Sequence, residues 1–175
     1  ALARDAEGTL SCACGYSAAP EDGVYNLLPS AERAELYPGE REDILDISRP
    51  GHETRLGEGW HEVEGVYGNK YRWIGARATA RLRRVRPGPL RLRIRGHAPE
   101  EAFAAGRPRI RAIVNGVEAG ALEPDRPGMF ILEADVPGAE EYEIAIEAQP
   151  VWHAPGDARD LTVNLSMIRL LERNR

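Results

Sequence analysis

The feature that most constrains the fold is a series of strand-length segments, divided by turn residues, that begins at Leu56 and continues along the rest of the chain. In residues 90–96 apolar and arginine side chains alternate strictly, which is typical of a strand with one buried face. Asn115-Gly116 joins two such segments and is the strongest short hairpin signal. The expected strands are residues 59–63, 67–85, 90–96, 109–114, 117–122, 130–136, 142–148 and 161–171.

This spacing predicts an all-β protein, an antiparallel and jelly-roll-like β-sandwich of about eight strands. A parallel α/β fold needs a helix between successive strands, and no segment shows the helical period of apolar residues. The long segment 67–85 is expected to bend near Gly75. In residues 142–148 we expect Tyr142, Ile144 and Ile146 to face the core.

Residues 1–50 differ from the rest, because glycine or proline recurs every few residues and leaves room for short elements only. We therefore expect a small irregular segment at 1–50 and the β-sandwich domain at 56–175. The elements expected in the first part are strands at 9–11 and 23–28 around a turn with two cysteines, a short helix from Ser30 to about Tyr37, and an apolar anchor onto the sandwich at 43–47.

The charge and hydropathy of the chain exclude two classes of partner. Its 175 residues include 28 acidic and 23 basic ones, a net charge of −5, whereas a dedicated nucleic-acid binder usually has a basic excess. No apolar run approaches the roughly 20 residues that a membrane span needs. No basic stretch followed by an apolar one indicates a signal peptide. We expect a cytoplasmic protein that neither inserts into a membrane nor binds nucleic acid.

Arginines crowd the stretch from Arg72 to Arg111, whereas acidic residues dominate residues 118–147. One interpretation is cross-strand ion pairing on a solvated face, each pair contributing about 0.2–1 kcal/mol. The other is an anion-binding face for an acidic glycan or, less favoured, for nucleic acid, which would need interleaved aromatic residues. We favour the ion pairs and keep the acidic glycan as the alternative.

A catalytic function finds little support. The chain has no nucleophile elbow, phosphate loop or zinc-protease motif. Four histidines, His52, His61, His97 and His153, are too far apart to show a ligand spacing, and we interpret them as surface or boundary residues. A glycosidase carboxylate pair is set by the fold and not by spacing, so a hydrolase or lyase stays an alternative without named residues. We predict a non-enzyme with no catalytic residues and no cofactor.

Metal sites are also weakly indicated. Cys12 and Cys14 are the two cysteines of the chain, whereas a structural zinc site needs four ligands. Cysteines this close in sequence do not readily form a disulfide. We favour free thiols over a metal site and predict no bound metal. Asp157 and Asp160 are the candidates for the alternative of a structural calcium ion.

The tryptophans are Trp60, Trp73 and Trp152. Trp152 lies in a loop bounded by proline and glycine at residues 149–156. A flat apolar ring beside polar groups is what sugar stacking requires, and it is equally what a loop plug looks like. We favour the plug and keep sugar contact open. Trp73 lies within a strand pattern and is expected half in the core and half at its rim.

Several motifs resemble a known family. Residues 59–64, Tyr71-Arg72-Trp73 and residues 76–82 resemble the opening G-W-x-x-x-E … R-W … A … L of a bacterial β-sandwich domain attached to glycosyltransferases and methyltransferases of surface-polysaccharide clusters. Residues 157–165 resemble its final strand, D-x-R-x-L-G-V-A-V … I-x-L, with Thr162 and Asn164 where the family has glycine and a small residue. The resemblance covers residues 56–172 and implies a carbohydrate-binding-module-like sandwich.

The front of the chain also resembles a known segment. Residues 10–16, 22–24 and 27–29 are similar to the leader C-x-x-C-G-x-x-Y … D-G-I … L-L-P, a zinc-ribbon-like segment that precedes many bacterial methyltransferase domains. One residue, and not two, separates the cysteines here, and the first knuckle is absent. The resemblance therefore implies a degenerate zinc ribbon fused to the sandwich.

Our leading hypothesis is a non-catalytic β-sandwich that binds a glycan or glycan precursor and is accessory to bacterial surface-polysaccharide or other glycan biosynthesis. The resemblance implies a glycosyltransferase or methyltransferase as its partner. Guanidinium groups pair well with carboxylates and vicinal hydroxyls, and binding is expected in the micromolar to millimolar range. The candidate ligand contacts are Trp152, Trp73, Arg72 and Arg159. The alternative is a structural docking domain for a transferase partner, with no glycan ligand.

Overall fold

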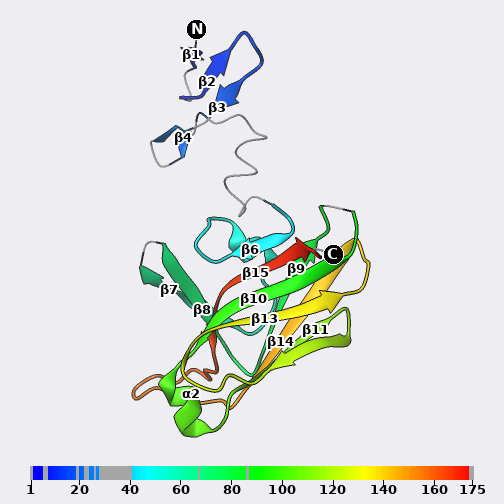
Figure 1. Ribbon diagram of the computed structural model, residues 1–175. Helices are drawn as coiled ribbons and strands as arrows, with labels where there is room; N and C mark the ends of the chain where they lie inside the picture. The colour runs from blue at the N-terminus through cyan, green and yellow to red at the C-terminus, as the bar shows by residue number, and fades with distance from the viewer. Residues whose placement is uncertain are drawn as a thin grey trace. The chain divides into compact units, whose positions relative to one another are not determined.

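The computed structural model describes residues 2–5, 8–18, 20–21, 24–25, 27, 41–66, 68–85 and 87–173. The chain divides into two compact units, Ala1–Pro38 and Gly39–Arg175 (Figure 1). Within the described residues, no helix is long and apolar enough to cross a membrane.

The first unit contains two small antiparallel sheets. One joins β1 (Leu2–Arg4), β2 (Leu10–Cys12) and β3 (Ser17–Ala18), and the other joins β4 (Pro20–Glu21) and β5 (Val24–Tyr25). β2 and β5 overlap the strands expected at 9–11 and 23–28, but the strand directly after the cysteine turn is β3, which was not expected, and β5 pairs with β4. The expected helix from Ser30 to Tyr37 lies outside the described residues.

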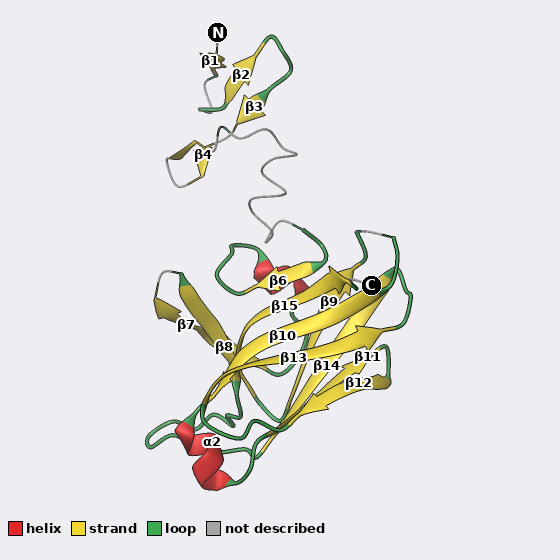
Figure 2. Ribbon diagram, in the orientation of Figure 1, coloured by secondary structure: helices red, strands yellow, loops and turns green. Residues whose placement is uncertain are grey.

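The second unit is an antiparallel β-sandwich, as predicted, and its two sheets form the two layers in Figures 1 and 2. One sheet has the strand order β13-β10-β15-β8-β7, with β6 added to β15, and the other has the order β12-β11-β14-β9. The strands are β6 (Ile44–Asp46), β7 (Trp60–Val66), β8 (Asn69–Ile74), β9 (Arg77–Arg83), β10 (Leu90–Ala98), β11 (Arg109–Val114), β12 (Val117–Leu122), β13 (Gly128–Val136), β14 (Glu141–Gln149) and β15 (Asn164–Glu172).

The sandwich has more strands than the sequence indicated, partly because the expected strand 67–85 is two strands. β8 belongs to the six-stranded sheet and β9 to the four-stranded sheet, so the chain changes layers where a bend was expected. The amide of Gly75 donates to the carbonyl of Gly59 at 3.1 Å, while the carbonyl of Ala76 accepts from Ala148 in β14 at 3.0 Å. The backbone hydrogen bonds thus move from one sheet to the other within two residues.

Alternation along the strands builds the core, as the sequence indicated. In β10 the side chains of Leu90, Leu92 and Ile94 are buried between the sheets, and the intervening arginines face outward. Residues of β14 repeat this pattern with Tyr142, Ile144 and Ile146 buried. The expected anchor at 43–47 forms β6, which pairs with β15 and buries two of its three side chains in the unit.

Two short helical segments were not expected. They are the 3₁₀-helix η2 (His52–Arg55) and the α-helix α2 (Glu100–Ala105). Each is too short to show the apolar period by which a helix is recognised in a sequence. α2 buries Ala102 against Trp152 and Leu161, which forms a second apolar cluster beside the main core.

Candidate functional site

A groove of about 680 Å³ lies on the outer face of the six-stranded sheet. Its floor is a row of side chains, each from a neighbouring strand. Trp73 of β8 is opposite Asn164 of β15, Asn164 is opposite His97 of β10, and His97 is opposite Met129 of β13. The lining residues are Ser48, Gly68, Asn69, Lys70, Tyr71, Trp73, Arg95, His97, Pro99, Glu101, Met129, Trp152, Asn164 and Ser166.

This row faces outward because of the strand period of two residues. The neighbours of the floor residues, Ile74, Leu165 and Phe130, point inward and belong to the core. Arg95 precedes His97 by two residues in β10 and also lines the groove. Its Nε donates to the hydroxyl of Ser166 at 3.0 Å. The groove therefore combines an aromatic end with a polar and cationic floor.

Three aromatic rings pack edge to face at one end of the groove. The ring of Tyr71 lies 6.0 Å from that of Trp73, and Trp73 lies 5.5 Å from Trp152. Trp152 is only 8% exposed, and its Nε1 donates to the carbonyl of Thr162 at 2.8 Å. Trp152 thus packs edge to face against Trp73, while Tyr71 and Trp73 are half-buried in the lining of the groove.

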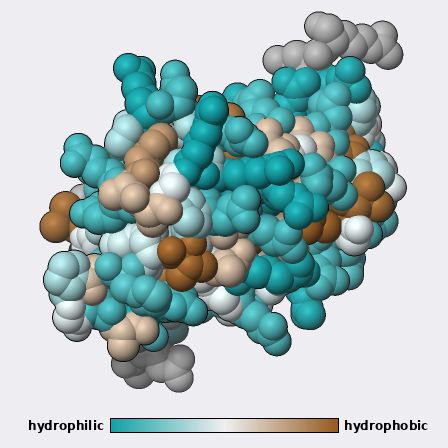
Figure 3. All heavy atoms as spheres, turned by 90° about the horizontal axis from the view of Figure 1, so that it is seen from below, coloured by the Kyte–Doolittle hydropathy of each residue, from teal (hydrophilic) through white to brown (hydrophobic). Residues whose placement is uncertain are grey.

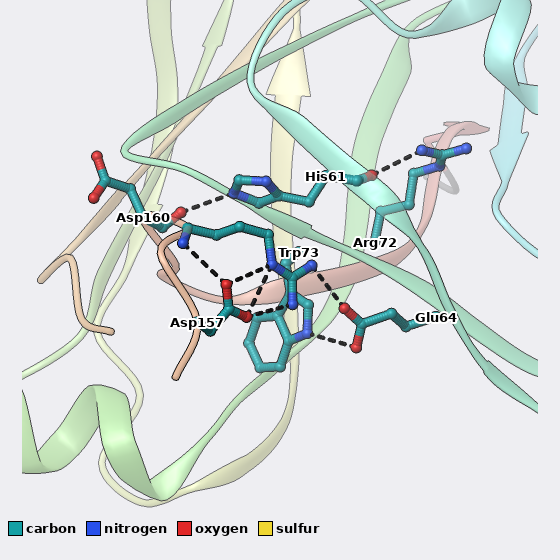
Figure 4. A network of polar contacts seen from close by, with 7 residues as sticks. His61, Glu64, Arg72, Trp73, Asp157 and Asp160 are labelled. Carbon is teal, nitrogen blue, oxygen red and sulfur yellow. Dashed lines mark hydrogen bonds and ion pairs between the residues drawn. The ribbon is translucent and has the colours of Figure 1, made fainter. Parts of the chain in front are cut away.

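The edge of Trp73 is fixed by an ion-pair network (Figure 4). Its Nε1 donates to Glu64 Oε2 at 3.2 Å, and Glu64 Oε1 accepts from Arg159 Nη1 at 2.8 Å. Arg159 also holds Asp157, with Nη2 2.6 Å from Asp157 Oδ2. The hydrogen bonds from Arg159 lower the pKa of Asp157 to about 2, and the two carboxylates raise the pKa of Arg159.

Arg72 lies on the opposite face of β8 and is buried. Its Nε donates to His52 Nε2 at 3.0 Å, and its Nη1 donates to the carbonyl of His61 at 2.7 Å. Glu53 is 3.6 Å from Arg72. A hydrogen bond from its own backbone amide, and then the charges of His52 and Arg72, lower the pKa of Glu53.

The structure separates the four candidate contact residues into two pairs. Trp73 and Trp152 line the groove, whereas Arg72 and Arg159 do not, and both arginines have carboxylate or histidine partners within the protein. Ligand contact by any of the four stays a prediction. Sequence reasoning did not single out Asn164, Arg95 or Lys70 as site residues. The signal for Asn164 was its departure from the small residue of the resembling family.

Outside the groove, arginines and acidic residues of adjacent strands form ion pairs. This confirms cross-strand ion pairing as the interpretation of the charge pattern there. Arg93 Nη2 lies 2.5 Å from Glu133 Oε1, and Arg111 Nη2 lies 2.7 Å from Glu118 Oε2. The hydrogen bonds that Arg111 donates to Glu118 raise the pKa of Arg111. Seen from the end of the sandwich that carries α2, the surface is mainly hydrophilic with scattered apolar groups (Figure 3).

The sequence positions considered for metals have protein partners. The amide of Cys14 donates to Cys12 Sγ at 3.3 Å, and interaction with Cys12 lowers the pKa of Cys14. Asp157 is held by Arg159, and Asp160 Oδ1 accepts from His153 Nε2 at 2.7 Å. Among the described residues, no group of three or more histidine, cysteine or acidic side chains is placed to hold a metal ion.

No protein-family model matches the chain, and no curated protein matches it. A family 35 carbohydrate-binding module from an environmental isolate is similar in structure, with 14% identity and a TM-score of 0.48 over 74% of this chain and 93% of that one. The CBM36-1 domain of a multidomain xylanase from the hindgut metagenome of Trinervitermes trinervoides is 11% identical, with a TM-score of 0.42. That match covers 75% of this chain and 98% of the CBM36-1 domain.

A family GH115 4-O-methyl-α-glucuronidase with specificity for decorated arabinogalactans gives 14% identity and a TM-score of 0.45. That match covers 66% of this chain and 17% of the enzyme's chain. At these TM-scores and identities the likenesses carry no argument. The strand pairing itself shows the β-sandwich.

Proposed function

We propose that this protein is a non-catalytic glycan-binding module and that the glycan lies in the groove on the six-stranded sheet. The observation that carries the proposal is the row Trp73–Asn164–His97–Met129 beneath an open groove of about 680 Å³. A sugar ring has apolar faces and a polar rim, so it fits a wall of aromatic rings beside amide and hydroxyl groups.

The aromatic wall supports binding because its rings are held in place before a ligand arrives. Trp152 packs against Trp73, and Glu64 accepts the hydrogen bond of the Trp73 indole. A prearranged surface loses little conformational entropy on binding. The proposed role is accessory: the module holds a glycan for a glycosyltransferase or methyltransferase in glycan biosynthesis.

A second candidate function is docking to such a transferase without any glycan ligand. The exposed side chains of Met129 and Ile131 favour it, because both lie on β13 at the edge of the six-stranded sheet. Apolar side chains at a sheet edge are typical of protein contacts. This candidate predicts that removal of these side chains weakens partner binding and that the folded chain binds no glycan.

A glycan array that spans neutral and acidic polysaccharides tests the proposal, followed by titration of tryptophan fluorescence with each hit. We expect Tyr71→Ala to weaken binding about tenfold or more, since it removes one ring from the groove wall. Val117→Ala serves as the matched control, because Val117 is exposed on β12 of the other sheet. A folded protein that binds nothing on the array would sink the proposal and favour docking.

A further inference from the structure

Half of the outward face of β10 is electrically neutralised by its neighbour β13. Arg91 Nε lies 3.0 Å from Asp135 Oδ1, and Arg93 Nη2 lies 2.5 Å from Glu133 Oε1. Each arginine is directly opposite the acidic residue that it pairs with in the ladder, Arg91 opposite Asp135 and Arg93 opposite Glu133. These two arginines are therefore committed to cross-strand ion pairs.

The other half of this face, which lies in the groove, has no such neutralisation. Arg95 is opposite Ile131, and His97 is opposite Met129, so the ladder places apolar residues where acidic ones stood two residues earlier. The Nε of Arg95 is fixed by Ser166, and its two Nη atoms have no hydrogen-bond partner among the described residues. A guanidinium held in this way presents a free pair of donors to the groove.

The other charged residues that line the groove also leave its positive charge largely unneutralised. Lys70 also lines it, and within the described part of the chain neither Lys70 nor Arg95 has a carboxylate within ion-pair distance. Glu101 of α2 is the acidic residue among the described lining residues. The groove thus carries an excess of positive charge on a chain whose net charge is −5.

Asn164 gives a second, independent indication of a polar ligand. Its side chain is 8% exposed on the groove floor and has no side-chain hydrogen bond with any described residue. The amide atoms of Asn164 are accessible from the groove, where water or a ligand can satisfy them. Its NH₂ group can donate to a negatively charged oxygen beside Arg95.

We infer that the glycan bound in this groove carries an acidic group, a carboxylate or a sulfate, and that Arg95 binds this group with Lys70 and Asn164 beside it. The inference rests on the proposed function, which it deepens by naming the class of sugar. Nucleic acid would offer anionic groups as well, but the acidic net charge of the chain disfavours it.

The test compares matched ligands that differ in charge. The probes are tetrasaccharides of galacturonic acid and of glucuronic acid, the same tetrasaccharides after reduction of their carboxyl groups, a sulfated galactose tetrasaccharide and a short single-stranded oligonucleotide. Each is titrated into the full chain by calorimetry at low and at high salt. We expect an acidic sugar to bind at least about tenfold more tightly than its neutral counterpart, with salt weakening the binding.

Two variants and one control test where in the groove the acidic group of the sugar binds. Arg95→Gln should lower the affinity for the acidic sugar at least about tenfold and leave the neutral sugar unaffected. Arg93→Gln is the matched control, because it lies on the same strand and face but is already paired with Glu133. Glu101→Gln should raise the affinity for the acidic sugar, since it removes a like charge from the groove.

The outcomes separate the inference from the proposed function. Equal or tighter binding of the neutral sugars overturns the inference and leaves glycan binding intact. Loss of affinity in Arg93→Gln equal to that in Arg95→Gln, or tighter binding of the oligonucleotide, also overturns it. A folded chain that binds no sugar, on the array or in these titrations, overturns both. Binding of carboxylated or sulfated sugars supports the inference and identifies which anion the groove takes.

Discussion

Asn164 lies directly opposite Trp73 in the antiparallel pairing of β15 with β8, and His97 is opposite it on the other side. Asn164 therefore lies between Trp73 and His97 in the row of residues that lines the groove. Polar side chains in such a position are normally satisfied by hydrogen bonds within the protein. Asn164 has none with the described residues, and its amide atoms are accessible from the groove, which leaves them available to a ligand.

Asn164→Ala should separate stability from binding. We expect the free energy of unfolding to change by less than about 1 kcal/mol, because no side-chain hydrogen bond is lost. The affinity for the glycan should fall about tenfold. Urea unfolding and calorimetry on the same preparation measure both quantities.

Asn115→Ala is the control for this prediction. Asn115 sits at φ 50° in the β11–β12 hairpin, donates to the carbonyl of Glu141 at 3.1 Å and accepts from the amide of Glu143 at 2.8 Å. Its replacement should cost stability and leave glycan affinity unchanged. If Asn164→Ala is as destabilising as Asn115→Ala, the amide of Asn164 serves the stability of the fold and not ligand binding.

Trp152→Ala should destabilise the sandwich strongly. The side chain is buried, packs on Trp73, Ala102 and Leu161, and donates a hydrogen bond to Thr162. Removal of a buried tryptophan costs about 3–5 kcal/mol of unfolding free energy. Chemical denaturation measures this loss, with Val151→Ala from the same loop as a nearly neutral control. A loss no larger than that of Val151→Ala would show that Trp152 is dispensable for packing.

The alternation of apolar and polar residues was enough to predict the class of fold. Strands such as β10 and β14 have one face in the core, and their period of two residues is visible in the sequence. The change of sheet at Gly75 was not predictable, because the strands on its two sides continue the same alternation. Sheet membership is decided by which distant strand supplies the hydrogen bonds, and that information is not local.

The candidate site was less predictable than the fold. Trp73 stood out because aromatic residues are rare in this chain. Arg95 did not, since it belongs to a series with Arg91 and Arg93 that looks uniform in the sequence. Only the register between β10 and β13 shows that two arginines face acids while Arg95 faces Ile131.

Gly96→Ala should be destabilising although Gly96 has no unusual backbone conformation. A Cβ at this position would lie 2.4 Å from the carbonyl oxygen of Asn164 and 2.6 Å from Cζ of Phe130. Such overpacking typically costs about 1–3 kcal/mol of unfolding free energy. Gly138→Ala is the control, because nothing lies within 4 Å of a Cβ built there. Equal stability of the two variants in urea would contradict the close packing of β10 on β15.

The ion pair between Arg93 and Glu133 should contribute little to stability. Their side chains are 41% and 32% exposed, so water and salt screen the attraction. A double-mutant cycle with alanine should give a coupling of about 0.2–1 kcal/mol that shrinks as salt is added. A larger, salt-insensitive coupling would mean that the pair is more shielded from solvent than its exposure indicates.

Asp157 should make the stability of the protein sensitive to acid. Its pKa in the folded state is about 2, below the usual 3.8, because Arg159 donates hydrogen bonds to the carboxylate. A lowered folded-state pKa stabilises the fold above the unfolded-state value, and this contribution is lost as the pH falls from about 4 towards 2. In Asp157→Asn the fall of unfolding free energy over this range should therefore be smaller than in the wild type. Carboxyl titration by NMR should also show the pKa of Asp157 rising towards 3.8 in Arg159→Gln. An Asp157 carboxyl that titrates identically with and without Arg159 would refute the ion-pair network that holds Glu64 and the edge of Trp73.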